Sequence, residues 1–157
     1  MNGVARAPKQ PGEVVHTDSA EPFQPDITDH KYFQVFVDER SRDKRVYGLK
    51  TKNEVTDATA AYIDQMVREG IPVQCISGDG AGELGRSLKF QRMLANNGTR
   101  WRKTPPRAPK TNGIAERAIK QLTGAARSQL VKAGLSDEYW FYAIIDAAFK
   151  TGGMPHE

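Results

Sequence analysis

The chain has 157 residues, of which 38% are hydrophobic and 27% are charged, and its formal net charge is +4. These values are typical of one globular domain with a real core, and they exclude a disordered chain. One cysteine, Cys75, and three histidines exclude an internal disulfide framework and a Cys/His zinc cluster. No apolar run approaches the ~18 residues that cross a bilayer. We expect an intracellular protein that has no zinc and no membrane segment.

The charge is divided unevenly along the chain. Residues 1–83 carry 10 basic and 14 acidic side chains, whereas residues 84–157 carry 13 and 5. From Arg86 to Ser136 there are twelve lysines or arginines and a single acid, Glu116. This asymmetry favours a nucleic-acid-binding face in the second half over a basic helix surface that is merely solvated.

The first half of the chain predicts three strands in succession. Residues 1–12 are polar and contain two prolines, which indicates a flexible tail before a domain at 13–157. Runs rich in β-branched and aromatic residues predict strands at 14–18, 32–38 and 45–50. Because their connections are short, we expect an antiparallel meander.

Helices and strands alternate in the second half. Apolar residues at helical spacing predict helices from Asn53 to just before Gly70, at 88–97, from the region of Ile114 to Gly134, and from Ser136 to about 150. Strands are predicted at 73–77 and 99–104, and a proline-rich loop precedes the third helix. The order predicts an α/β fold, a five-stranded mixed sheet flanked by helices.

Three acids stand where such a sheet would present side chains to one edge. Asp18 ends the first strand, Asp79 follows the fourth, and Glu116 is expected in the first turn of the helix after the proline-rich loop. Clustered carboxylates repel one another unless cations neutralise them, and a set of oxygen ligands selects Mg²⁺ or Mn²⁺. Two such ions could activate an attacking oxygen and stabilise the leaving oxygen of a phosphodiester.

Each acid also has an ordinary structural interpretation. Asp18 could be a turn residue, and Asp79 between two glycines could form an Asx turn. Glu116 could be favoured by the helix macrodipole and by Lys120 four residues later.

Other polar residues compete for the same roles. Asp38 also ends a strand, but the neighbouring arginines favour a turn or pairing role for it. Glu83 is a weaker candidate for the third ligand. His16 is interpreted as a strand-face residue and not as a base.

Four motifs together resemble the catalytic core of retroviral and retrotransposon integrases, most closely the copia type. They are VVHTDSAEPF at the first acid, KYFQVFVDERSR with VYGLKTKNE after it, SGDGAGEL at the second acid, and PKTNGIAERAIKQL at the third. The closing LSDEYWFYAIIDAAF is similar to the next helix of that family. The resemblance covers roughly residues 12–155.

The resemblance implies a ribonuclease H-like fold in which Asp18, Asp79 and Glu116 hold two Mg²⁺ or Mn²⁺ ions. It implies DNA as the partner, with trimming of element ends followed by transfer of the freed 3′-hydroxyl to a target duplex. The segment 104–113 would be a mobile active-site loop. The residues expected to contact DNA are Arg107, Lys110, Asn112, Arg117, Lys120 and Arg127.

Family cores also imply self-association and a cellular location. We expect a homodimer or higher homo-oligomer through helices 113–133 and 137–150, with Tyr139 and Trp140 at the contact, although this apolar stripe is equally compatible with an internal core. The resemblance alone suggests a nuclear location or one within a virus-like particle.

The sequence departs from the integrase pattern in several places. Gly80-Ala81-Gly82-Glu83-Leu84 replaces the usual Asn-Gly-Gly-Glu-Phe, 36 residues separate Asp79 from Glu116, and Thr123 stands where retroviral relatives have a second lysine. We expect no counterpart of the integrase zinc module or of its C-terminal domain, and therefore weak or no full integration by this chain alone. The alternative to an active core is a catalytically inactive or domesticated DNA-binding and dimerisation module.

Overall fold

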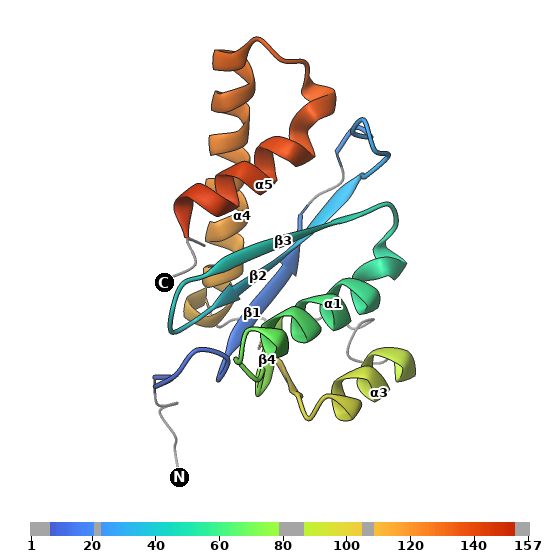
Figure 1. Ribbon diagram of the computed structural model, residues 1–157, viewed down its shortest axis with the longest axis vertical. Coiled ribbons are helices and arrows are strands. Elements are labelled where there is room, and N and C mark those ends of the chain that lie inside the picture. Colours follow the sequence, from blue (N-terminus) through green and yellow to red (C-terminus); the bar gives the residue numbers. More distant parts are fainter. Residues whose placement is uncertain (1–6, 21–22, 79–86, 105–108, 153–157) are drawn as a thin grey trace.

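The computed structural model describes residues 7–20, 23–78, 87–104 and 109–152, with the backbone alone for 109–112. The described residues form a five-stranded sheet in the order β3-β2-β1-β4-β5 (Figure 1). The strand β2 pairs antiparallel with both β3 and β1, whereas β4 and β5 run parallel to β1. In chain order the strands are β1 (Val15–Ser19), β2 (Tyr32–Asp38), β3 (Lys44–Leu49), β4 (Cys75–Gly78) and β5 (Arg100–Lys103).

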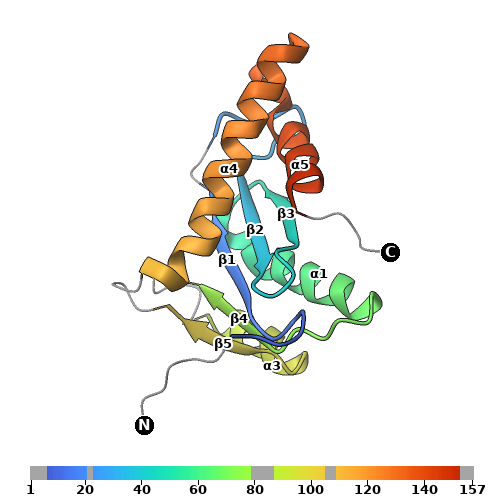
Figure 2. The same ribbon diagram turned by 90° about the vertical axis from the view of Figure 1, so that its left-hand side faces the viewer.

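Helices cover both faces of the sheet, as Figures 1 and 2 show. One face packs on α1 and α3, and the other packs on α4 and α5. Short 3₁₀ turns precede α1 and α5. The helical elements of the described chain are η1 (Lys52–Glu54), α1 (Val55–Arg68), α3 (Leu88–Asn96), α4 (Pro109–Ala133), η2 (Asp137–Tyr139) and α5 (Trp140–Thr151).

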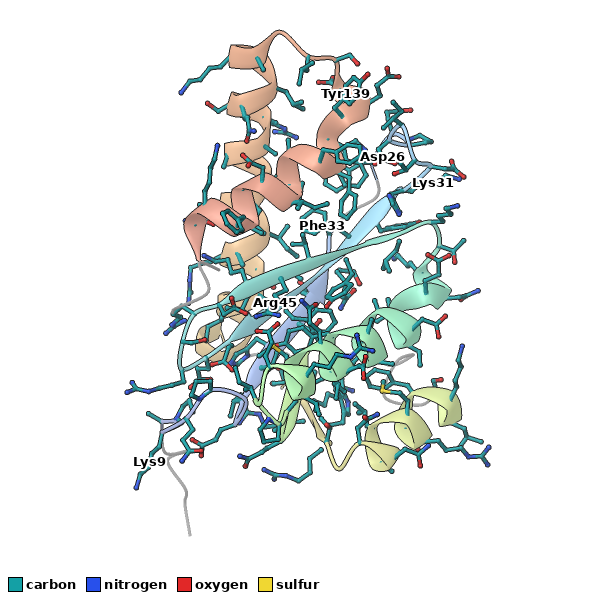
Figure 3. The ribbon with its side chains drawn as sticks, in the orientation of Figure 1. Lys9, Asp26, Lys31, Phe33, Arg45 and Tyr139 are labelled. Carbon is teal, nitrogen blue, oxygen red and sulfur yellow. The ribbon has the colours of Figure 1, made fainter. Side chains whose placement is uncertain are left out.

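Alternation along the strands divides the core between the two layers. In β2, Phe33 and Val35 join the cluster beneath α4 and α5, while Phe36 joins the cluster beneath α1. Figure 3 shows Phe33 between the sheet and α5, and Arg45 of β3 on the side of α1. The five-stranded mixed sheet flanked by helices that the sequence predicts is confirmed.

Two boundaries differ from the predictions. The helix α4 begins at Pro109, not near Ile114, because proline at a first helical position has a suitable φ and needs no amide donor. Glu116 therefore lies about two turns into the helix and not in its first turn. Gly12, assigned to the tail, is buried and donates its amide to Asp38 Oδ2 at 2.6 Å, so packed structure already includes it.

Candidate active site

Asp18 lies near the end of β1 on the sheet face that α4 covers. It is half-buried and stands opposite Val35, a member of the core cluster beneath α4 and α5. Its Oδ1 accepts a hydrogen bond from the Ser19 amide at 2.9 Å. The strand β1 is central: β2 pairs with it from Val15 to Ser19, and β4 pairs with it at Val15 and His16, so the backbone that leads to this carboxylate is held on both sides.

A polar network on the opposite face holds the two neighbours of Asp18. Gln34 Nε2 donates to Thr17 Oγ1 at 2.7 Å, and Ser19 Oγ donates to Gln34 Oε1 at 2.5 Å. Thr17 Oγ1 donates in turn to the Val35 carbonyl at 2.8 Å. Gln34 is only 2% exposed, so its amide is committed to this clamp. The clamp fixes the direction in which Asp18 leaves the sheet.

The strand β4 ends beside β1 at Gly78. A Cβ at Gly78 would lie 3.2 Å from the Thr17 carbonyl oxygen and 2.9 Å from Trp101 Cη2, so only glycine fits without displacement. The Gly78 carbonyl accepts the Thr104 amide at 2.8 Å. The described chain thus brings the end of β4 against the residue before Asp18. Asp79, the predicted second ligand, lies outside the described residues.

Glu116 is exposed on α4, which packs against β1 and β2 through its other side. The buried side of the helix carries Ala115, Ala118 and Leu122, which flank the glutamate in sequence. Since the macrodipole acts within the first turn only, it gives no reason for a glutamate at this depth. Asp18 thus lies on the sheet face that α4 covers, and Glu116 lies on an exposed side of that helix. Their predicted convergence with Asp79 at one edge of the sheet stays a prediction.

A row of cations continues from Glu116 along α4. Arg117, Lys120 and Arg127 are exposed, and the last two fall on the same side of the helix as Glu116 by helical periodicity. Eleven residues of helix place Arg127 about 16 Å from Glu116 along the axis. Of the other predicted DNA contacts, Arg107 lies outside the described residues, and for Lys110 and Asn112 only the helical backbone is described.

The competing residues have structural roles where the structure describes them. Asp38 is fully buried and accepts the amides of Arg40 and Ser41 at 2.9 Å, so its prediction as a turn residue is confirmed. His16 lies on a strand face, 2% exposed, with Nε2 2.6 Å from Glu39 Oε1. Burial is the main cause that lowers the pKa of His16, against the raising effect of Glu39. Glu83 lies outside the described residues.

Sequence reasoning missed the Gln34 clamp. The available signal was a glutamine in the middle of the apolar strand YFQVFVD, where a buried polar side chain needs hydrogen-bond partners. It also missed Ser77, which is 1% exposed and whose Oγ lies 3.1 Å from Thr104 Oγ1. Both features support the strand ends on which the candidate site is built.

The sequence allows Trp140 either a place at a subunit contact or a place in the internal core. The structure buries its side chain within the chain. It is 7% exposed, stacks on Phe23 with ring centroids 4.6 Å apart, and donates Nε1 to the Gln24 carbonyl at 2.7 Å. The intramolecular alternative is thus the correct one for this residue. The apolar side chains of α5 that do reach the surface are Tyr142, Ile145 and Phe149.

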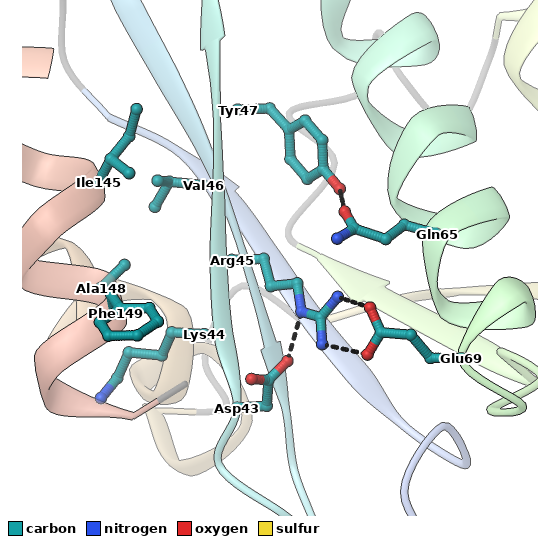
Figure 4. Close-up of a pocket in the computed structure, with 10 residues that line it drawn as sticks. All are labelled: Asp43, Lys44, Arg45, Val46, Tyr47, Gln65, Glu69, Ile145, Ala148 and Phe149. Atoms are coloured by element: carbon teal, nitrogen blue, oxygen red, sulfur yellow. Dashed lines mark hydrogen bonds and ion pairs between the residues drawn. The ribbon is translucent and has the colours of Figure 1, made fainter. Parts of the chain in front are cut away.

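A groove of about 440 Å³ lies along β3, the sheet edge opposite β5 (Figure 4). One of its walls contains Ile145 and Phe149, and the other contains Arg45 paired with Glu69. The two Nη atoms of Arg45 donate to the carboxylate at 2.6 and 2.8 Å, and this pairing lowers the pKa of Glu69. Neither Asp18 nor Glu116 lines this groove.

The donor chemistry of the described site suits a hard divalent cation. Asp18 and Glu116 supply carboxylate oxygens, and the nearby His16 is engaged with Glu39. Within the described ranges, no three His, Cys, Asp or Glu side chains converge as a metal cluster. Asp79 lies outside these ranges. The carboxylates that are described fit such a cation in kind, and the complete ligand set stays a prediction. A helix long and apolar enough to cross a membrane is also not found in the part of the chain described.

Comparison with known structures defines the class of fold. One match, with a TM-score of 0.74 and 17% identity, covers all of this chain and 54% of a chain in the cryoEM structure of a simian T-cell lymphotropic virus intasome in complex with PP2A regulatory subunit B56 gamma. Another, with a TM-score of 0.65 and 17% identity, covers 90% of this chain and 85% of the HTLV-2 integrase catalytic core domain, in complex with magnesium and in a trimeric form. The fold is that of retroviral integrase catalytic cores.

Sequence comparison identifies the relatives more narrowly. The chain is 31% identical over 145 residues to the retrovirus-related Pol polyprotein from transposon TNT 1-94 of Nicotiana tabacum, and 25% identical over 148 residues to that from transposon RE2 of Arabidopsis thaliana. These matches cover 91% and 93% of this chain but only 11% and 10% of the polyproteins. No family model matches. The chain is homologous to a segment of the Pol polyproteins of copia-type retrotransposons.

Proposed function

We propose that the chain is the metal-dependent catalytic core of a DNA strand-transfer enzyme of the integrase type. Asp18, Asp79 and Glu116 would hold two Mg²⁺ or Mn²⁺ ions. The observation that carries the proposal is the position of Asp18 near the end of β1, on the sheet face that is covered by α4, the helix of Glu116. The end of β4 at Gly78 lies against Thr17, the residue before Asp18. The homology to retrotransposon Pol polyproteins and the integrase-core fold support it.

The bound ions would polarise a phosphodiester and lower the pKa of an attacking water or hydroxyl. The chain itself positions the carboxylates. Gln34 is hydrogen-bonded to the side chains on both sides of Asp18, and the buried stripe of α4 packs beside Glu116. Such preorganisation matters because misplacement of about 1 Å can cost on the order of 100-fold in rate.

The cations of α4 would hold the substrate against these carboxylates. Arg117, Lys120 and Arg127 are exposed, and the ion pairs found among the described residues do not involve them. Phosphate contacts of this kind position DNA without reading its sequence. We assign the same role to Arg107, Lys110 and Asn112, which precede them in the chain.

Nicking and strand transfer of a labelled duplex with Mn²⁺ test the proposal. Asp18→Asn and Glu116→Gln should each reduce the rate at least 100-fold, since each removes a ligand of the ions. Glu138→Gln is a matched control, because Glu138 is also an exposed acid on a helical element. Activity that survives both site substitutions would refute the assignment. Duplex binding without any metal-dependent nicking would favour the inactive DNA-binding module instead.

We also propose that the chain self-associates through α5. Tyr142, Ile145 and Phe149 are 53%, 43% and 54% exposed, and two of them form a wall of the groove beside β3. Sedimentation velocity should show a concentration-dependent dimer or higher oligomer that Phe149→Ser weakens. Val131→Ser is the control, since Val131 is 81% exposed on α4. Equal effects of both substitutions would argue against this surface.

A further inference from the structure

The edge strand β5 has an unusual sequence, Arg100-Trp101-Arg102-Lys103, in which three of four side chains are cationic. Arg100 and Lys103 are exposed and Arg102 is half-buried. Elsewhere in the described chain Arg45, Arg68, Lys89 and Lys150 form ion pairs. No ion pair of the described residues involves the three cations of β5. Their charge is available to an external anion.

The backbone of β5 adds hydrogen-bond donors at the same edge. The amides of Arg100 and Thr104 donate to the carbonyls of Gln74 and Gly78 at 2.9 and 2.8 Å, towards β4. Because donors alternate in direction along a parallel edge strand, the amides of Trp101 and Lys103 point away from the sheet. Residues two apart on a strand are separated by about 6.6 Å, which is similar to the separation of successive phosphates in a nucleic-acid strand.

Trp101 is not placed to stack on a base. It is half-buried, and its ring meets Phe90 edge-on at a centroid distance of 5.2 Å. A single-strand binding surface normally adds exposed aromatic platforms to its cations. The β5 edge therefore suits contacts to phosphates and not to bases, and we expect it to be indifferent to sequence.

Short contacts connect this edge with the candidate active site. Lys103 pairs with Gly78, whose backbone lies against Thr17, the residue before Asp18. Arg102 pairs with Ser77 and its Nε lies 3.4 Å from Ser77 Oγ. A polyanion lying on β5 would thus pass the end of β4 beside β1.

From this arrangement we infer that the β5 edge is a phosphate-binding track, in which Arg100, Arg102 and Lys103 hold the backbone of duplex DNA as it leaves the active site. The inference rests on the proposed function and extends it to a surface separate from α4. Charged edge strands also prevent sheets from pairing with one another. That role requires no DNA contact, so the two interpretations differ in a measurable way.

The test is the salt dependence of binding to a labelled duplex, followed by fluorescence anisotropy. For the triple variant R100Q/R102Q/K103Q we expect the slope of log K against log salt to fall in magnitude by about 2 to 3, at about 0.9 per lost phosphate contact. The control K31Q/K50Q/K52Q removes the same charge from exposed sites at the ends of β2, β3 and η1, and its slope should change by less than half as much. R100Q/K103Q leaves the Arg102 contact with Ser77 intact and should lower the slope by about 1 to 2, by the same relation.

The possible outcomes separate this inference from the proposed function. If the β5 variants match the control while K120Q/R127Q loses slope, the track is wrong and the proposed DNA substrate stands. If the β5 variants only aggregate more, with an unchanged slope, edge protection is the correct role. If the unmodified chain shows no salt-dependent DNA binding, both proposals fail.

Discussion

Replacement of Gln34 by methionine tests whether the clamp beneath Asp18 serves the metal site. Methionine is similar in length but cannot donate to Thr17 or accept from Ser19. Each lost hydrogen bond should cost about 1 kcal/mol, and the Ser19 bond less, because Ser19 is half-buried and can reach water. We expect the free energy of unfolding to fall by about 1–2 kcal/mol.

The same substitution should weaken Mn²⁺ binding by about 10- to 100-fold, the usual effect of losing a residue that orients a ligand. Isothermal titration calorimetry measures this affinity, and urea unfolding shows that the variant is folded under the same conditions. Thr59→Ala is the matched control: Thr59 is fully buried in α1 and donates to the Val55 carbonyl at 2.8 Å, away from the site. If Gln34→Met loses stability but binds Mn²⁺ within twofold of the unmodified chain, the clamp is purely structural and our reasoning is wrong.

Three further predictions concern the packing around the site and the stability of the fold. Gly78→Ala places a methyl 2.9 Å from Trp101 and should cost about 1–3 kcal/mol in urea unfolding, together with a loss of nicking activity. Leu122→Ala removes a side chain on the buried side of α4 that is 0% exposed, and it should lower the free energy of unfolding by about 2–5 kcal/mol. The midpoint of the urea transition should fall, with little change in the slope of the free energy against urea concentration. Because Arg45 lowers the pKa of Glu69, this pair stabilises the fold above the ordinary glutamate pKa of about 4.3 and the contribution is lost as pH falls through the lower folded-state value. Because the Glu69 side chain is exposed to solvent, Glu69→Gln should be less stable than the unmodified chain by about 0.2–1 kcal/mol near neutral pH. The free energies of unfolding of the two proteins should converge in acid.

Much of the fold followed from periodicity alone. The strands at 32–38 and 45–50 and the helix at 88–97 agree with β2, β3 and α3 within one or two residues. Alternation and helical spacing are local, and here the tertiary structure agrees with them. The helical segment before β4 indicates a strand that runs parallel to its neighbour, and the structure shows that this neighbour is β1.

Other features depended on information that is not local. The sequence predicts a loop at Pro109 because proline usually breaks helices. Proline is favourable at the first position of a helix, however, and Pro109 occupies that position in α4. Trp140 belongs to an apolar stripe that could face either a partner subunit or the core. Its hydrogen bond to the carbonyl of Gln24, which is far away in sequence, shows that it belongs to the core. The role of Gln34 could not be predicted without the register that places Thr17 and Ser19 beside it on the neighbouring strand.

The composition of α4 links the two halves of the candidate site. Its buried stripe is rich in small residues, with Ala115, Ala118 and Ala126 each at most 3% exposed. The distance between packed elements depends on the side chains at the contact, so alanines allow α4 to lie close to β1 and β2. Glu116, between two of these alanines, is therefore held near the sheet while it remains exposed. The apolar packing on either side of Glu116 thus positions this acid within the basic segment. The exposed cations around it can then bind the phosphates of the proposed DNA substrate.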